Sequence, residues 1–547
     1  MVGKYQQALN RLYLKIQYSE ELSLLLLGQS LREIKPLRVL IIDLDMGHNT
    51  HKVRLEDLVQ LIGTWNGSET FSTLRLYISQ NYPSKFLLED LSSILMISKD
   101  MQTFDLYLKS KNDNFNCTFE KNRSAFKIKL VDSNATDEGI EALAQSLQEI
   151  NYITNFSFII QNHKKEVTNK SVTTLFQIFK DRNNLSSLEF HLGVYVYHKC
   201  VEEFCALVME MRKSATFDLD LALEDVRLEW KLDQSRSSLI LSLSTNKRMK
   251  EVAKALKSVS INELIINSYT ISPTHVQSIA LLKNIKNLSK LEVNCSRLKI
   301  TTPGIKALSL ALKELESSDF SFHIQGCDFF NETAMKHLSS ALNEKKKLTS
   351  LTLNFEENKE ITNKGMKELS TCLSQMASLQ SYSIYLDKCK GLTHEVVDIL
   401  NSQIKNLKSL KTLGLSLSGF HLNKKSMQAF FKEIRNVKVL KLRFSEITDA
   451  GLVIVNSALK ELVEVESLEL NLHNPFKFPN ERIKELSINS LVESIEQLKK
   501  LHSVKLDFQQ IQAYGDQNTL QSSLEQLGYL KDIEVKAHLT KSLWVLE

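Results

Sequence analysis

The feature that most constrains this chain is a short apolar motif that recurs along almost its whole length. Residues 410–419 read LKTLGLSLSG, with leucines at positions i, i+3, i+5 and i+7. Marked at its second leucine, the motif recurs every 27 to 36 residues at Leu264, Leu291, Phe320, Leu351, Tyr382, Leu413, Leu440, Leu468, Val504 and Ile533. Less regular copies are marked by Leu40, Leu74, Phe104, Phe126, Phe156, Leu188 and Phe217. Seventeen copies at a near-constant period predict a repeat architecture.

Each copy predicts one strand followed by one helix. Apolar residues at alternating positions indicate a strand with one buried face, since successive side chains point to opposite faces. Further along each clear copy, a Thr stands three residues before a glycine and a run of apolar residues at helical spacing. The examples are TDEGIEALAQSL from Thr136, TTPGIKALSLAL from Thr301, TNKGMKELSTCL from Thr362 and TDAGLVIVNSAL from Thr448. The Thr oxygen can cap the first helical turn, and the apolar stripe can pack on the strands.

Two strands joined through a helix lie parallel, and a period of about 30 residues suits such a unit. Helices are wider than the strand spacing of roughly 4.8 Å, so stacked units curve the sheet. We therefore expect an α/β solenoid of about 17 repeats, a horseshoe with a parallel concave β-sheet and convex helices.

The combined pattern, L-x-x-L-x-L followed by (T/N)-x-x-(G/A/S) and an amphipathic helix, resembles the ribonuclease-inhibitor-like class of leucine-rich repeats. The resemblance covers residues 30–540 and is strongest over residues 260–510. The sequence differs from the family in two ways. The usual asparagine after the strand is inconsistently placed, and an extra apolar residue such as Phe355 lengthens the strand.

The predicted organisation is one array with a cap and no linkers. We expect residues 1–34 to form an N-terminal helical cap and residues 35–547 to form a continuous leucine-rich-repeat array. Three segments break the period. Residues 109–125 predict a loop or hairpin, residues 217–262 predict extra strands before a helix near 246–259, and residues 473–482 lengthen one copy.

Charge and cysteine content exclude several classes of protein. The chain has 69 Lys and Arg against 64 Asp and Glu, which is a weak signal for nucleic-acid binding. We expect Lys345–Lys347 and the pair Lys424 and Lys425 to be solvated. Seven scattered cysteines indicate free thiols in a reducing compartment. The run at residues 22–27 is too short for a membrane span, so we expect no membrane insertion.

No motif for catalysis, cofactor binding or metal binding stands out in the sequence. The nearest metal-like cluster is His198, Cys200 and Cys205, whose spacing does not place both sulfurs on one helix face. We therefore expect no enzyme activity, no cofactor and no metal site.

The remaining candidate site is the concave face of the predicted sheet. In the four central copies, only one of the twelve side chains on this face is charged, which suits a protein segment better than a nucleic acid. Exposed tyrosines can anchor a partner, although each could equally fill the pleat between strands. The candidate protein-binding residues are His323, Asn354, Tyr385, Ser383, Ser416, Arg443, Tyr77 and Tyr107.

The first functional hypothesis is a non-enzymatic scaffold, a subunit of a hetero-complex that binds other proteins through its concave face or helical flank. The second is a GTPase activator resembling the leucine-rich-repeat activators of Ran, which usually end in an acidic tail that this chain lacks; loop arginines such as Arg297 are present. The third is an enzyme inhibitor, as in the family's namesake. The Lys-, Asn- and Ile-rich composition is similar to that of AT-rich protist proteins, and the long array resembles ciliary components. We expect a cytoplasmic, cytoskeletal or ciliary location.

Overall fold

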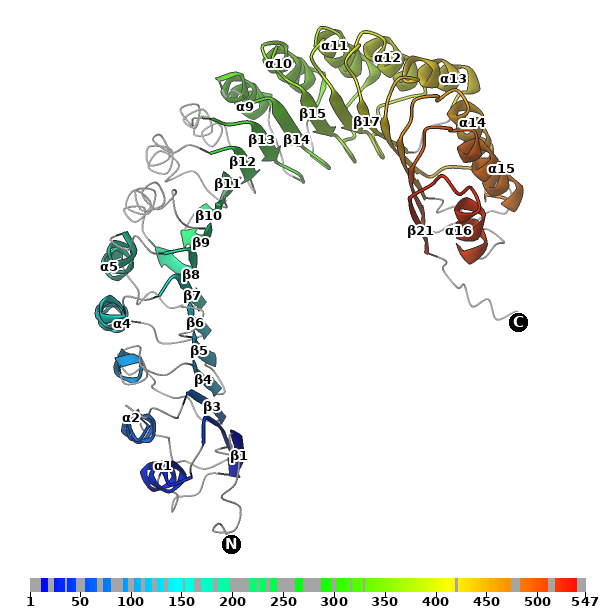
Figure 1. Cartoon of the computed structure of the whole chain (residues 1–547). Coiled ribbons are helices and arrows are strands. Elements are labelled where there is room, and N and C mark those ends of the chain that lie inside the picture. Colours follow the sequence, from blue (N-terminus) through cyan, green and yellow to red (C-terminus); the bar gives the residue numbers. More distant parts are fainter. Residues whose placement is uncertain are drawn as a thin grey trace, which may run out of the picture. The chain divides into compact units, whose positions relative to one another are not determined.

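The structure is a computed structural model of the chain. The structure describes residues 11–17, 24–34, 37–45, 55–65, 72–79, 92–96, 103–109, 114–120, 125–131, 136–150, 153–161, 169–180, 185–196, 216–223, 226–232, 237–243, 261–268, 287–297, 302–314, 317–327, 330–418, 422–473, 483–509 and 517–538. The chain divides into two compact units: unit 1, residues 1–242 and 247–261, and unit 2, residues 243–246 and 262–547. In both units, strands alternate with helices along the chain (Figure 1).

Unit 2 contains the most regular repeats. Its strands are β12 (Glu263–Ser268), β13 (Lys290–Asn294), β14 (Asp319–His323), β15 (Ser350–Asn354), β16 (Ser381–Tyr385), β17 (Thr412–Ser418), β18 (Val439–Ser445), β19 (Ser467–His473), β20 (Ser503–Gln509) and β21 (Asp532–His538). Its described helices are α9 (Thr302–Glu314), α10 (Glu332–Asn343), α11 (Asn363–Leu373), α12 (Glu395–Ile404), α13 (Lys424–Glu433), α14 (Asp449–Leu459), α15 (Glu485–Glu496) and α16 (Gln517–Glu525).

The sheet of unit 2 is parallel throughout. Each strand from β12 to β20 pairs in parallel with the next strand along the chain. The apolar marker residues are opposite one another in the register; Leu413, for example, pairs with Tyr382 on one side and Leu440 on the other. These markers are buried, apart from the half-buried Ile533 on the last strand. The strand prediction and its parallel pairing are confirmed.

The helices of unit 2 form as their capping residues predict. The Oγ1 of Thr448 accepts a hydrogen bond from the Gly451 amide at 3.2 Å, and Thr362 caps α11 in the same way. In α11, the stripe of Met366, Leu369 and Leu373 is buried. The helices therefore cover one face of the sheet, as Figure 1 shows for α9–α13, and leave the other face open.

A recurring turn follows the strands of unit 2. Six residues after the marker, Arg297, Gly326, Glu357, Lys388 and Glu446 each have a φ between 57° and 63°, in the left-handed region. In three of these turns, the next residue is Cys327, Asn358 or Cys389, whose side chain bonds back to the preceding repeat. Asn358 Nδ2 donates to the Ile324 carbonyl at 2.8 Å, and Cys389 Sγ donates to the Phe355 carbonyl at 2.9 Å. These bonds supply side-chain donors to backbone carbonyls of the preceding repeat.

Unit 1 has the same plan with more irregularity. Its strands are β1 (Arg11–Gln17), β2 (Val39–Asp45), β3 (Thr73–Ser79), β4 (Thr103–Lys109), β5 (Asn114–Glu120), β6 (Ala125–Val131), β7 (Asn155–Gln161), β8 (Ser187–Val196), β9 (Thr216–Leu223), β10 (Val226–Leu232) and β11 (Ser237–Leu243). The helices with described bounds are α1 (Leu24–Arg32), α2 (Leu55–Gly63), α4 (Asp137–Glu149) and α5 (Asn169–Lys180). Strands β1–β4 pair in parallel, and so do β6–β9.

The irregular segments of unit 1 contain antiparallel strands. The sequence predicts a loop or a hairpin at residues 109–125, and the structure shows the second: β5 pairs antiparallel with both β4 and β6. In the segment 217–262, β10 pairs antiparallel with β9, and β11 is a further strand, as predicted. The predicted helix near 246–259 and the insertion at 473–482 lie outside the described residues apart from His473.

The predicted helical cap at residues 1–34 is wrong in part. Residues 11–17 form β1, which pairs in parallel with β2, and only α1 is helical among the described residues of this segment. The reason is alternation: Leu12 is opposite the marker Leu40, and Leu14 and Ile16 continue the same face of the strand. The sheet therefore begins one copy earlier than the sequence motif indicates.

All seventeen predicted marker residues lie in described strands, and the two units have the α/β fold of leucine-rich repeats. Four cysteines, Cys295, Cys327, Cys372 and Cys389, are buried free thiols, as predicted for them. The cluster of His198, Cys200 and Cys205 lies outside the described residues.

Candidate protein-binding surface

The open face of unit 2, the sheet face away from the helices, carries six of the predicted site residues. Strands β15 and β16 alternate half-buried and buried residues, so Asn354, Ser383 and Tyr385 lie on this face, with His323 on β14. In the register, His323, Asn354, Tyr385, Ser416 and Arg443 form one row across five adjacent strands. The strand pairing thus brings these residues together.

The centre of the open face is shallow because β17 carries a glycine there. A Cβ at Gly414 would overlap the Ser383 Oγ and lie 3.0 Å from the Ser383 Cβ. The Ser383 side chain therefore occupies the space beside Gly414, and any larger residue at 414 must displace it. A partner chain could approach the sheet closely at this point.

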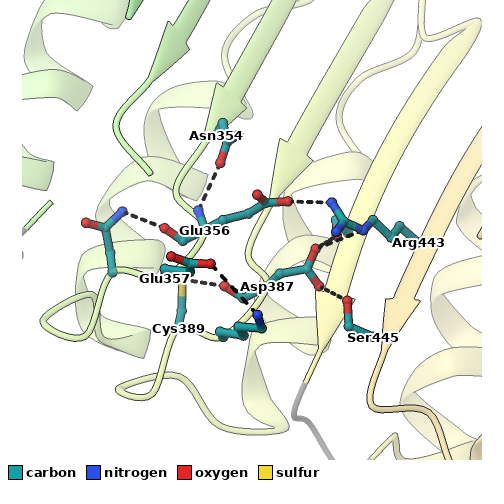
Figure 2. A network of polar contacts seen from close by, with 10 residues as sticks. Asn354, Glu356, Glu357, Asp387, Cys389, Arg443 and Ser445 are labelled. Atoms are coloured by element: carbon teal, nitrogen blue, oxygen red, sulfur yellow. Dashed lines mark hydrogen bonds and ion pairs between the residues drawn. The ribbon is translucent and has the colours of Figure 1, made fainter. Parts of the chain in front are cut away.

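Arg443 is held at one end of this row by two buried carboxylates. Its Nη1 is 3.0 Å from Glu356 Oε1, and its Nε is 3.6 Å from Asp387 Oδ2. The Glu356 and Asp387 side chains are only 11% and 5% exposed, whereas that of Arg443 is 47% exposed. Figure 2 shows Arg443 reaching from β18 toward the turns that follow β15 and β16. Glu356 and Asp387 thus fix the guanidinium, while about half of the Arg443 side chain remains exposed.

Hydroxyl and amide groups complete this network. Ser445 Oγ donates to Asp387 Oδ1 at 3.2 Å, and Ser416 Oγ donates to Asp387 Oδ2. The Asn354 Oδ1 accepts from the Glu356 amide at 3.0 Å, which holds the turn that carries the first carboxylate (Figure 2). Ser416 is fully buried, so it supports the network and does not present a hydroxyl to a partner.

Because the two carboxyl groups are buried close together, it is unfavourable for both to be ionised at once. Burial raises the pKa of Glu356 to about 7, and the neighbouring Asp387 adds to this effect while Arg443 opposes it. One guanidinium is therefore shared between two acids that lie close together. Near neutral pH, protonation of Glu356 changes the net charge at the edge of the open face.

His323 and Tyr385 are half-buried members of the same row. Burial lowers the pKa of His323, and Glu292 Oε1, which lies 4.0 Å from its Nε2, partly opposes this shift. His323 is therefore favoured in its neutral form. With neutral His323 and Tyr385, the row offers hydrogen-bonding groups and one exposed cation, Arg443.

Charged side chains flank the row on its C-terminal side. Lys441 pairs with Glu469 at 3.1 Å, and Lys505 pairs with Glu534 at 2.9 Å across neighbouring strands. These pairs are about half exposed and neutralise one another. The least charged part of the open face therefore lies on β14–β17, as the sequence predicted.

The two remaining candidate residues, Tyr77 and Tyr107, lie in unit 1. They are opposite each other on β3 and β4, and their ring centroids are 6.2 Å apart. Tyr77 is 39% exposed. Nearby on the same sheet, the Tyr13 hydroxyl donates to Asp43 Oδ2 at 3.1 Å. The pair forms a separate aromatic patch in its own unit.

Sequence reasoning missed Glu356 and Asp387. Both stand five residues after the marker, beyond the strand positions from which the face was predicted. The sequence did contain a signal for this pair of acids. They occupy equivalent positions in adjacent copies, 31 residues apart, each two residues before a turn residue, Asn358 or Cys389. Arg443 lies three copies after Glu356 and two copies after Asp387. Only the fold shows that it reaches them.

Among the described residues, no group of three or more His, Cys, Asp or Glu side chains is arranged to hold a metal ion. Within the same residues, no helix has the length and apolar character needed to span a bilayer.

The described residues of both units have an α/β fold of leucine-rich strand–helix repeats, and in unit 2 the open sheet face is polar. No protein-family model matches the chain, and no curated protein matches it in sequence. Among solved structures, it is similar to a chain of the crystal structure of the Rad7 and Elc1 complex in yeast, at 12% sequence identity and a TM-score of 0.31. The alignment covers 95% of this chain and 89% of that chain. Because this TM-score is low, the fold assignment rests on the register and repeats described above.

Proposed function

We propose that the protein is a non-enzymatic scaffold of the ribonuclease-inhibitor-like class that binds a partner protein on the open face of unit 2. The observation that carries this proposal is the guanidinium of Arg443, which Glu356 and Asp387 fix in place. It lies at the end of the row whose other members, on β14–β17, are uncharged. A repeat array of this kind commonly uses its open sheet for binding, which is an analogy at the level of fold.

Arg443 is the proposed anchor for physical reasons. Arginine is enriched among residues that dominate interface energetics. Because Glu356 and Asp387 already fix its side chain, a partner that bonds to the exposed part of the guanidinium loses less conformational entropy than it would with a free arginine. The small side chain of Ser383 and the absence of one at Gly414 allow a partner backbone to lie beside it.

The uncharged row favours a polypeptide over a polyanion. A nucleic acid needs a track of several cations, and Arg443 is flanked by residues whose charges are already paired, such as Lys441 with Glu469. We expect the partner to offer a carboxylate or carbonyl oxygen to Arg443 and small or aromatic side chains to the row at Tyr385.

A crosslinking experiment tests the proposal. A photoreactive amino acid is placed at Tyr385, and at Leu310 on α9 as a control that is 59% exposed. Native extracts are irradiated, and neighbours are identified by mass spectrometry. We expect a reproducible protein neighbour at position 385 that is absent at 310 and is lost when Arg443→Glu is added. Crosslinks that are the same at both positions, or that are unaffected by Arg443→Glu, would refute binding at this face.

The alternatives stay predictions and have direct assays. A GTPase activator would accelerate GTP hydrolysis by a small GTPase, and Arg297→Ala would abolish that effect. An inhibitor would reduce the activity of the enzyme recovered by crosslinking. A cytoskeletal or ciliary location is tested by imaging the tagged chain in cells.

A further inference from the structure

A pocket of about 190 Å³ lies at the opposite edge of unit 2 from the Arg443 network. It is formed by the C-terminal ends of α12 and α13 and by the turns that lead into β17 and β18. Its floor is aliphatic, since Leu407, Leu410 and Val437 are between 2% and 7% exposed. Its rim carries four exposed cations, Lys405, Lys408, Lys432 and Arg435.

The cations of this rim lack counter-charges. Glu433 is the one acidic residue that lines the pocket, and within the described part of the chain none of the four cations forms an ion pair. Cations near a helix C-terminus are common because they interact favourably with the helix dipole, and this accounts for Lys405 and Lys432. It does not account for Lys408 and Arg435, which stand beyond the last helical residues.

Elsewhere on this edge, cations pair with acids of the neighbouring repeat, and one such pair starts at Lys438, at the end of the turn into β18. Lys438 Nζ is 2.5 Å from Glu466 Oε1, and Lys500 Nζ is 2.6 Å from Glu464 Oε2. At α12 and α13, by contrast, the facing turns both carry cations. These exposed like charges are therefore available to attract a carboxylate from outside the chain.

The cationic rim is short. The preceding turn, residues 374–380, contains no charged residue, and the following turn carries Glu461, Glu464 and Glu466. The axes of two packed helices lie roughly 10 Å apart, so the group of cations can attract an anionic segment only over about that width. A nucleic-acid backbone running along this edge would meet the acidic turn, where its phosphates would be repelled.

We propose that this pocket binds a short acidic segment of a partner polypeptide. An aliphatic side chain of the segment lies on Leu407, Leu410 and Val437, and its flanking carboxylates pair with the rim cations. The volume of about 190 Å³ is below the range of pockets for drug-sized ligands and fits a single aliphatic side chain. This surface is distinct from the open face, and the proposal does not depend on binding there.

The test uses the full-length protein and labelled peptides. Fluorescence anisotropy measures the binding of a peptide with one leucine between pairs of glutamates and of a matched peptide with glutamines in place of the glutamates. We expect the acidic peptide to bind at least about tenfold more tightly than the glutamine peptide, because charge-assisted hydrogen bonds exceed neutral ones. We expect Lys408→Gln with Arg435→Gln to remove this difference.

The matched control is Lys424→Gln with Lys425→Gln, which removes two exposed cations at the start of α13, away from the pocket. This variant, and Arg443→Ala on the open face, should bind the acidic peptide as the wild type does. Equal binding of the two peptides, an equal loss in the control variant, or tighter binding of an oligothymidine than of the acidic peptide would each overturn the proposal.

Discussion

At the scale of single residues, the Arg443 network concentrates charge where the surrounding protein excludes water. Glu356 and Asp387 share one guanidinium, and two serine hydroxyls donate to Asp387. Such a buried network is stable only while its groups remain paired. It therefore makes the edge of the open face sensitive to pH and to small changes of shape.

The first prediction concerns pH. The folded protein raises the pKa of Glu356 from 4.5 to about 7, so it holds this proton more tightly than the unfolded chain does. The free energy of unfolding should therefore fall as pH rises through this interval. Glu356→Gln removes the titration, so its stability relative to the wild type should increase with pH by on the order of 1–3 kcal/mol.

Urea unfolding at several pH values across this interval measures the effect. Glu360→Gln is the matched control, because that side chain is exposed and is not among the groups that shift the pKa of Glu356. Its stability difference from the wild type should not vary across the interval. A parallel pH dependence for the wild type and Glu356→Gln would contradict the assignment.

The second prediction concerns Gly414. Gly414→Ala should cost about 1–3 kcal/mol, since its Cβ must displace the Ser383 side chain. Ser383→Gly should relieve most of this cost, giving a coupling of about 1–2 kcal/mol in a double-mutant cycle. Gly63→Ala is the control, because a Cβ at that position meets nothing within 4 Å. Simple additivity of the two substitutions would show that the contact is unimportant.

At the scale of the structural element, side-chain caps begin α10, α11, α13 and α14, and side-chain bonds close three of the turns. Cys327, Asn358 and Cys389 stand at the same place in three adjacent copies and donate to a carbonyl of the preceding copy. Burial raises the pKa of the Cys389 thiol to about 12, so it remains a neutral donor. Asparagine and cysteine thus perform the same structural task.

The third prediction follows from this equivalence. Asn358→Leu removes the side-chain donor to the Ile324 carbonyl, which should cost about 1–3 kcal/mol, whereas the Phe355 carbonyl keeps its bond from Cys389 Sγ. Cys389→Asn should stay within about 1 kcal/mol of the wild type, because asparagine already fits this position one copy earlier. Chemical denaturation of both variants measures the difference. A larger loss for Cys389→Asn than for Asn358→Leu would refute the equivalence.

At the scale of the whole molecule, stability is a sum over neighbouring repeats within each unit. Unit 2 has its own parallel sheet from β12 to β21 and its own buried core. A compact unit with its own core can fold alone in principle. The division of the chain falls within the irregular segment at 217–262.

The fourth prediction is that residues 262–547 fold without the rest of the chain. This fragment should give a cooperative thermal transition by circular dichroism and retain protection of its buried thiols. A fragment of residues 302–547 is the control. It lacks β12 and β13, so α9 loses a strand against which to pack Ile305 and Leu308, and it should unfold at a lower temperature. Equal transitions for the two fragments would show that stability does not depend on these repeats.

The sequence by itself determined the repeat, the parallel register and the helix caps of this protein. These features are local, since alternation of buried leucines and a capping Thr such as Thr448 act within one copy. It also predicted a loop or hairpin at 109–125, but it misassigned residues 11–17, where β-alternation over seven residues overrides an apparent helical pattern.

Only the tertiary structure decided which side chains meet between copies. Arg443 lies 87 residues from Glu356 and 56 residues from Asp387 in the sequence, yet strand stacking brings all three together. The pocket between α12 and α13 likewise depends on two turns from different copies. Such contacts depend on strand spacing, turn conformation and burial, which are set when repeats stack and are not encoded in any one of them.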